Sequence, residues 1–237
     1  MKLFACLAGC AVLSLLSARA DLTLVQNVEG AGPVTTMAIK IKGDKARIES
    51  SSEITTIIDS ASGDILNLMN EQKKFVRISA SQAKAVAEMA VQPEKKDAPA
   101  VKPQLNPTGK KETINGYETE EYVCDAPAFK ASYWIAPKYP NSAAIVRELQ
   151  AMTPRAWNVS GKGMPDYRDF PGLPLRSRIS IARKEIVSTL VSVKQDPLPA
   201  SDFTPPAGFE EVKMPDMGAM LGGSKPSKAK PPASPKP

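Results

Sequence analysis

Apolar and polar side chains alternate along residues 21–78 with the period of two that a half-buried β-strand shows. Met37, Ile39 and Ile41 would face one side of such a strand, and Lys40 and Lys42 the other. Turn-forming residues separate this strand from the next predicted ones, which cover 45–49, 54–58, 65–69 and 75–78. Connections this short cannot make parallel crossovers, so the pattern predicts an antiparallel meander.

The period changes to that of an amphipathic helix after residue 78 and again near residue 141. A cap at Ser79 or Ser81 precedes apolar positions that share one helical face, namely Ala83, Val86, Ala87 and Ala90. A second short helix is predicted over 141–152, with Asn141 as its cap and Pro154 beyond its end. Strands are predicted on both sides of an Asn115-Gly116 hairpin turn and over 130–135, 175–181 and 186–194.

About ten strands and two short helices define the expected architecture. We expect a mainly β fold in which one antiparallel sheet is strongly curved or forms an unclosed β-barrel. A β-sandwich is the alternative. Residues 21–214 would form this single domain, with a proline-rich excursion at 92–109, while 215–237 hold too few apolar residues to fold.

Residues 1–20 have the composition of a secretory signal peptide. Lys2 precedes an apolar run from Leu3 to Leu16, and the small residues of Ala18–Ala20 form a cleavage site before Asp21. The run is shorter than the roughly 20 residues of a membrane-spanning helix. We therefore expect export to the periplasm or the extracellular space. A lipoprotein anchored through an acylated Cys10 is the alternative.

The cysteine and histidine content limits which disulfides, catalytic mechanisms and metal sites the chain can form. Cys124 alone would remain after cleavage, which excludes an intramolecular disulfide and favours a small buried side chain in a strand over a reactive thiol. The chain has no histidine, which excludes Ser-His-Asp and Cys-His catalysis and histidine-ligated metals. Ser81 and Lys84 match the S-x-x-K pattern of penicillin-interacting enzymes, but the supporting motifs are missing and Ser81 also fits a helix cap. We expect neither an enzyme nor a cofactor.

The net charge of +6 lies largely in the two ends of the chain, and aromatic residues are only 5% of it. This pattern excludes a nucleic-acid interface, which combines a basic face with stacking aromatics. Arg176 and Arg178 share one strand face, which is either an exposed polar face or a site for an anionic headgroup. The tail offers thioethers suited to Cu(I) at three positions, namely Met214, Met217 and Met220.

Three segments, taken together, are typical of one protein family. They are Ile114–Tyr117 with Tyr122 on the same strand, the loop Phe170–Leu175, and the closing segment Phe203–Phe209. Over about 22–214 the chain resembles a family of exported bacterial proteins catalogued as domain of unknown function 4412. That family is similar in shape to periplasmic lipoprotein carriers and receptors of the LolA/LolB kind, which hold acyl chains in an unclosed β-barrel with helical lids. The resemblance implies this fold and an apolar ligand, and it implies no particular binding residues.

These observations favour a non-enzymatic envelope protein that binds a lipid or an acylated peptide on a concave sheet. If the apolar faces of the strands turn inward, the candidate lining residues are Met37, Ile39, Ile41, Leu66, Leu68, Ile179, Ile181, Val191 and Val193. A structural or protein-interaction module with a packed core is one alternative, and Cu(I) binding by the methionine tail is another. The expected partners are a lipid, a lipoprotein or an envelope protein, with membrane contact only through acylated Cys10 or the basic tail.

Overall fold

The computed structural model describes residues 21–30, 32–90, 104–126, 129–151, 165, 167–181 and 184–213. The predicted signal peptide with Cys10, most of the proline-rich excursion and the three tail methionines lie outside these residues. Within the described ranges, no helix combines the length and the apolar character needed to cross a membrane.

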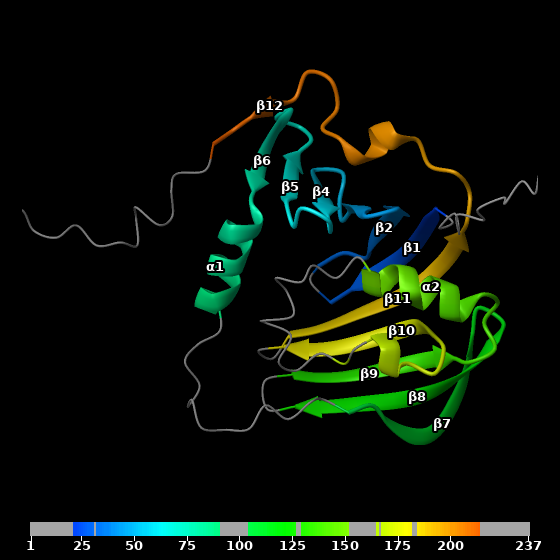
Figure 1. The fold of residues 1–237 in the computed structure, drawn as a ribbon. Helices are drawn as coiled ribbons and strands as arrows, with labels where there is room; N and C mark the ends of the chain where they lie inside the picture. Colours follow the sequence, from blue (N-terminus) through cyan, green and yellow to red (C-terminus); the bar gives the residue numbers. More distant parts are fainter. Residues whose placement is uncertain are drawn as a thin grey trace, which may run out of the picture.

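One sheet of twelve strands dominates the described residues (Figure 1). Its order is β12-β6-β5-β4-β3-β2-β1-β11-β10-β9-β8-β7, and every neighbouring pair is antiparallel except β12 with β6. The strands are β1 (Leu22–Glu29), β2 (Thr35–Lys42), β3 (Lys45–Glu49), β4 (Ile54–Asp59), β5 (Ile65–Met69), β6 (Lys74–Ile78), β7 (Asn106–Ile114), β8 (Tyr117–Ala126), β9 (Phe129–Ala136), β10 (Leu173–Ile181), β11 (Lys184–Lys194) and β12 (Glu210–Glu211). The two end strands do not pair with each other, so the sheet is open.

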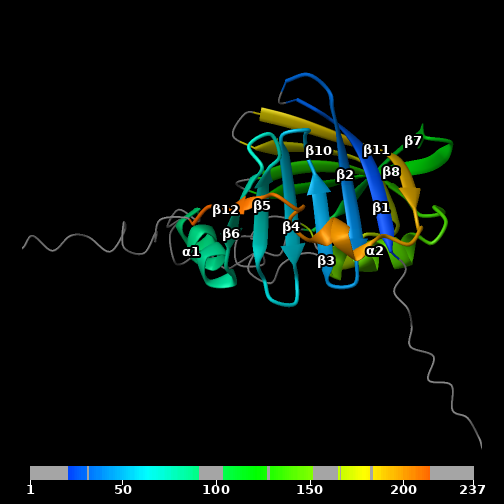
Figure 2. The same cartoon turned by 90° about the horizontal axis from the view of Figure 1, so that it is seen from above.

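The predicted fold class is confirmed. The sheet curves so that β1–β5 and β8–β11 form two walls that face each other, as seen from above in Figure 2. The helices are α1 (Ala80–Ala90) and α2 (Ser142–Ala151), with short 3-10 turns η2 (Tyr167–Asp169) and η3 (Ala200–Phe203). A single continuous sheet excludes the β-sandwich. Strand β7 begins at Asn106, so the last residues of the predicted excursion already belong to the sheet.

The concave face of the meander β1–β6 is filled by its own side chains. The strand registers align one apolar row across all six strands: Leu22, Ile41, Ala46, Ile58, Ile65 and Ile78. Helix α2 contributes Ile145 and Val146 to the same core, and α1 contributes Ala83. This row is the direct product of the alternation seen in the sequence, because paired residues of antiparallel strands point to the same face.

The convex face of the meander is covered by the C-terminal segment 195–213, which we call the strap. Phe209 packs on a cluster formed by Ile57, Leu66, Leu68 and Phe75. The strap ends as β12, where Glu210 and Val212 donate backbone hydrogen bonds to the carbonyls of Lys73 and Phe75 over 2.9 and 2.8 Å. The meander is therefore covered on both faces, by the core on one side and by the strap on the other.

Local signals in the sequence account for the turns and one of the helix ends. Asn115 and Gly116 have φ angles of 51° and 81°, as the predicted type I′ hairpin requires. The hydroxyl of Ser79 accepts from the backbone N–H of Gln82, whose side-chain oxygen accepts from the Ser79 N–H, so Ser79 and not Ser81 caps α1. At the start of α2, the backbone carbonyl of Asn141 accepts from the N–H groups of Ala144 and Ile145, and its side-chain amide donates to Gln195.

Candidate functional site: a hollow on the concave face

A hollow of about 140 Å³ lies on the concave face between the two walls of the sheet. Strands β1, β2, β9, β10 and β11 line it, together with α2 and the loop before β10. The apolar part of the lining includes Leu24, Ile39, Tyr133, Leu149, Phe170 and Ile179. These residues come from segments far apart in the sequence, so the site exists only in the folded chain.

Two β-bulges flank the hollow and bend the wall behind it. The register shifts between Val25 and Gln26 where β1 pairs with β11, and between Pro174 and Arg176 where β10 pairs with β9. A bulge inserts an unpaired residue, bends its strand and raises the local twist. Pro174 has no backbone N–H to give to the ladder, which fits its place at a bulge. The bulges in β10 and β11 therefore produce the curvature that leaves this space open.

The Phe170–Leu175 loop closes one side of the hollow. A Cβ on Gly172 would collide with the backbone of Ala136 and Pro137, so only glycine lets the loop lie against the end of β9. This approach sets the Phe170 ring edge-on to Tyr133, with ring centroids 5.0 Å apart and an interplanar angle of 82°. Such an edge-to-face pair is the favoured geometry for two aromatic rings.

The polar side chains of the lining are mostly uncharged. They include Gln26, Ser177 and Ser188, all half-buried. Arg176 also borders the hollow, but its guanidinium donates to both carboxylate oxygens of Glu112, at 2.8 and 3.0 Å. The described residues hold no group of three or more Cys, Asp or Glu side chains that could bind a metal ion.

The nine predicted lining residues are not all on one face. Ile39 and Ile179 line the hollow, and Met37 lies beside them on the same face of β2. Ile41 and Val193 also face the concave side, but they belong to the packed core or lie against it. Register places Ile181 opposite Lys184 at the end of β10, and its side chain is outside the described set.

Leu66, Leu68 and Val191 do not lie on the concave face. Leu66 and Leu68 point to the convex face, where they pack under the strap. Val191 is the unpaired residue of the β1–β11 bulge, and 51% of its surface is exposed. Strand β5 is apolar on both faces because the two faces are covered by different layers, so alternation alone cannot assign its orientation. A binding role for any of the nine stays a prediction.

Sequence reasoning did not select several residues that line the hollow. Leu149 lies on the predicted apolar face of the second helix, and Phe170 lies in the loop segment that carries the family resemblance, so both had a signal. Ser177 shares the apolar face of its predicted strand with Leu175 and Ile179, so its orientation had a signal. Gln26 and Ser188 had none, because a polar residue at a strand position is ordinarily assigned to the solvent face.

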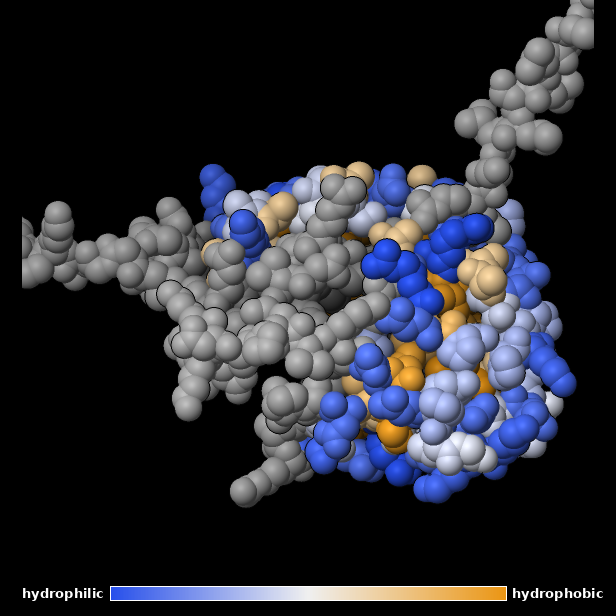
Figure 3. Space-filling view, turned by 60° about the horizontal axis from the view of Figure 1, so that its bottom comes forward, coloured by the Kyte–Doolittle hydropathy of each residue, from blue (hydrophilic) through white to orange (hydrophobic). Residues whose placement is uncertain are grey.

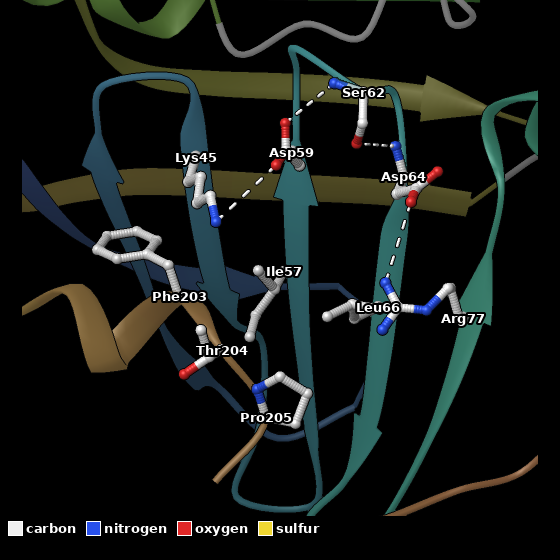
Figure 4. A pocket seen from close by; sticks show the side chains of 10 residues that line it. All are labelled: Lys45, Ile57, Asp59, Ser62, Asp64, Leu66, Arg77, Phe203, Thr204 and Pro205. Carbon is white, nitrogen blue, oxygen red and sulfur yellow. Dashed lines mark hydrogen bonds and ion pairs between the residues drawn. The ribbon is translucent and has the colours of Figure 1, made fainter.

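A second pocket, of about 190 Å³, lies on the convex face beneath the strap (Figure 4). Ile57 and Leu66 lie in it beside Phe203 and Pro205 of the strap. Its charged groups oppose one another. Lys45 lies 3.9 Å from Asp59, and Arg77 lies 3.9 Å from Asp64. This pocket is thus a strap-to-sheet junction whose charges are already matched, and we take the concave hollow as the better candidate site.

The side chains with nucleophilic or titratable groups outside the hollow show no sign of activation. Cys124 is 1% exposed, and burial together with the nearby Asp125 raises the pKa of its thiol, which keeps it protonated and unreactive. Ser81 is exposed on α1, with its hydroxyl 3.0 Å from that of Ser79. Burial also raises the pKa of Tyr139, with a smaller contribution from Tyr117, whose ring centroid is 4.6 Å away.

Arg176 and Arg178 both stack on Trp134, with guanidinium carbons 5.5 and 5.4 Å from the ring centroid. Arg176 is also paired with Glu112, and Arg178 lies 3.6 Å from Glu185. These contacts explain the two arginines as a paired and stacked surface cluster. Figure 3 shows hydrophobic side chains at the surface, as an orange band bordered by hydrophilic residues.

Comparison with known proteins gives weak structural matches and one family. PNGF-II matches with 12% identity and a TM-score of 0.42 over 85% of this chain, which spans 32% of that structure. The Mycobacterium tuberculosis lipoprotein LppX matches with 13% identity and a TM-score of 0.40, over 77% of this chain and 90% of LppX. A DUF1329 family protein from Desulfovibrio piger matches with 10% identity and a TM-score of 0.32, over 79% and 90%.

No curated protein sequence matches the chain. The predicted family is confirmed by a match over residues 21–209, which runs from the residue before β1 to Phe209 of the strap. The chain therefore belongs to the family described as domain of unknown function (DUF4412).

Proposed function

We propose that the protein is an exported, non-enzymatic envelope protein that binds an apolar ligand, a lipid or an acylated peptide, on its concave face. The observation that carries this proposal is the hollow of about 140 Å³, which interrupts an otherwise packed face and has a largely apolar lining. Apolar ligands bind in concave sites of this kind, where a few polar groups set their orientation. The signal-like residues 1–20 support an envelope location.

The size of the hollow limits what it holds. An apolar cavity of roughly 150 Å³ accepts a molecule the size of benzene. The hollow therefore has room for a segment of about six carbons, and a longer acyl chain would extend beyond it. Each methylene that leaves water contributes about 0.8 kcal/mol, so the enclosed segment would contribute about 5 kcal/mol before the costs of ordering the ligand.

A packed interaction module is the second candidate, and the filled half of the concave face favours it. The row from Leu22 to Ile78 belongs to one packed core on this face, together with Ile145 and Val146 of helix α2. In this case the function would lie in contacts with another envelope protein. Cu(I) binding by the methionine tail stays a separate prediction, tested by truncation after Lys213.

Native mass spectrometry of the protein from its own envelope fraction, before and after organic extraction, tests the proposal. We expect an additional mass that extraction removes as lipid. In parallel, Ile179→Phe fills the hollow and should weaken uptake of a fluorescent acyl probe. Val191→Phe is the matched control, because that side chain is exposed at the bulge. A bare chain that takes up no probe, or equal uptake by both variants, would favour the packed module.

A further inference from the structure

Three uncharged polar side chains lie next to one another in the hollow. Ser177 of β10 pairs directly with Ser188 of β11, so their side chains point to the same face about 5 Å apart at Cβ. Ser188 also pairs with Val28 of β1, which places Gln26, two residues earlier on that strand, on the adjoining diagonal. The strand registers thus bring two hydroxyls and one amide together on the floor of an apolar site.

These three side chains make no hydrogen bond with any other described residue. All three are half-buried and line the hollow. A polar side chain that points into an apolar site needs either water or a polar ligand group as its partner. The arrangement therefore offers donors and acceptors to whatever enters the hollow.

The charge around the hollow is compensated. Among the described lining residues Arg176 is the charged one, and its guanidinium is held by both oxygens of Glu112. It also stacks on Trp134. Among the described lining residues, a ligand carboxylate would find no cation that lacks a carboxylate partner. An unpaired buried charge costs far more than a hydrogen-bonded neutral group.

We infer that the ligand places an uncharged hydrogen-bonding group, an ester, amide or alcohol, against Gln26, Ser177 and Ser188. The protein then selects neutral acyl esters or amides over free fatty acids. This inference rests on the proposed function and specifies the ligand class of the same site. The apolar lining holds a short segment of the chain, and the three polar side chains fix the position of its head.

A displacement experiment tests the selection. The full exported chain is loaded with a fluorescent acyl probe and titrated at about pH 8 with monodecanoylglycerol or with decanoate, which have the same acyl chain. We expect monodecanoylglycerol to displace the probe at a concentration at least about tenfold lower. The double variant Ser177→Ala, Ser188→Ala removes both hydroxyls with little change in volume. Its affinity for monodecanoylglycerol should fall about three- to tenfold.

Two controls separate a polar role from a structural one. Ser192→Ala changes a serine of the same strand that pairs with Val25, on the opposite face of β1 from Gln26, and should leave both titrations unchanged. Displacement by decane, which has no head group, should be unaffected by the double variant. If decanoate competes as well as the ester, or the double variant binds the ester normally, the inference is overturned while apolar binding stands. If no probe or ligand binds, both the inference and the proposed function fail.

Discussion

The two walls of the sheet differ in how they are covered. Over β3–β6 the meander is packed on both faces, with the core on the concave side and the strap on the convex side, while its first two strands border the hollow. The wall formed by β8–β11 carries the two bulges and borders the hollow. The packed strands of the meander therefore contribute most to stability, while the wall with the bulges leaves a hollow on the concave face.

This difference shows how one continuous sheet provides both a rigid support and a site. Direct cross-strand pairing in the meander places apolar side chains in unbroken rows, which close-packed interiors require. Bulges break such rows and re-aim side chains, and they are common beside functional sites. The comparison makes the site a consequence of interrupted pairing and not of a separate domain.

Truncating one isoleucine on each wall should give the largest contrast. Ile58→Ala removes a side chain that is 2% exposed in the meander core, and we expect it to lower the free energy of unfolding by about 2–5 kcal/mol. Ile179→Ala acts beside existing space on a half-buried side chain, so it should cost only about 1 kcal/mol. Urea denaturation of the two variants measures both values.

The wild-type chain is the reference, and the slopes of the unfolding transitions should stay the same, so that differences in midpoint report stability alone. Equal losses for the two variants would mean that both walls are packed alike. That result would favour the packed interaction module over ligand binding.

The same contrast explains how far the sequence predicted the fold. The meander was predicted closely because alternation, short turns and β-branched runs all point to one arrangement there. The hairpin at Asn115-Gly116 followed from local chemistry in the same way, and so did a serine cap at residue 79 or 81, which the structure assigns to Ser79. Local signals of this kind depend only on neighbouring residues, so they can be read without the tertiary structure.

The site was predicted only in part, because its decisive features are not local. The bulge at Val191 shifts the register by one residue, and no periodicity marks it. Leu66 and Leu68 were predicted on the concave face because they are apolar. They are buried on the convex face instead, where the strap, more than a hundred positions later in the sequence, covers them. Ser177 and Ser188 become neighbours only through the pairing of β10 with β11.

A smaller effect is expected where the strap is attached to the meander. The carboxylate of Asp202 accepts a hydrogen bond from Lys40 over 3.1 Å, and its backbone carbonyl accepts one from Arg47 over 3.0 Å. Both side chains of the Lys40–Asp202 pair are about a quarter exposed, so Asp202→Asn should cost about 1 kcal/mol and loosen the strap. Urea denaturation and the rate of proteolysis within the strap measure the two effects.

Glu118→Gln is the matched control for this attachment. It neutralises one partner of the Lys111–Glu118 pair, whose side chains are 61% and 66% exposed, and should change stability by less than about 0.5 kcal/mol. Proteolysis of the strap should not change in this variant. If Asp202→Asn leaves both measurements at the wild-type value, the strap is held by Phe203 and Phe209 and the charge pair adds nothing.

The smallest effect concerns the pH dependence of Cys124, on β8 of the wall that carries the bulges. Burial, aided by Asp125, raises the pKa of its thiol in the folded protein, whereas the unfolded chain keeps an ordinary thiol pKa near 8.5. Above about pH 8.5 the unfolded chain loses this proton while the folded protein still holds it. The folded state then binds more protons, so stability falls as the pH rises. Below this range both states are protonated and the thiol contributes no pH dependence.

Cys124→Ala isolates this contribution from the other groups that titrate at high pH. Unfolding by urea, in the presence of a reductant, gives the free-energy difference between wild type and variant at several values from about pH 7 to 10. We expect a constant difference below about pH 8.5 and a shift in favour of the variant above it, because only the wild type has a thiol whose ionisation favours the unfolded chain. A difference that stays constant to pH 10 would show that the thiol ionises equally in both states. The interior of this wall would then be open to water at β8, and the hollow would be part of a wider solvent-filled cleft.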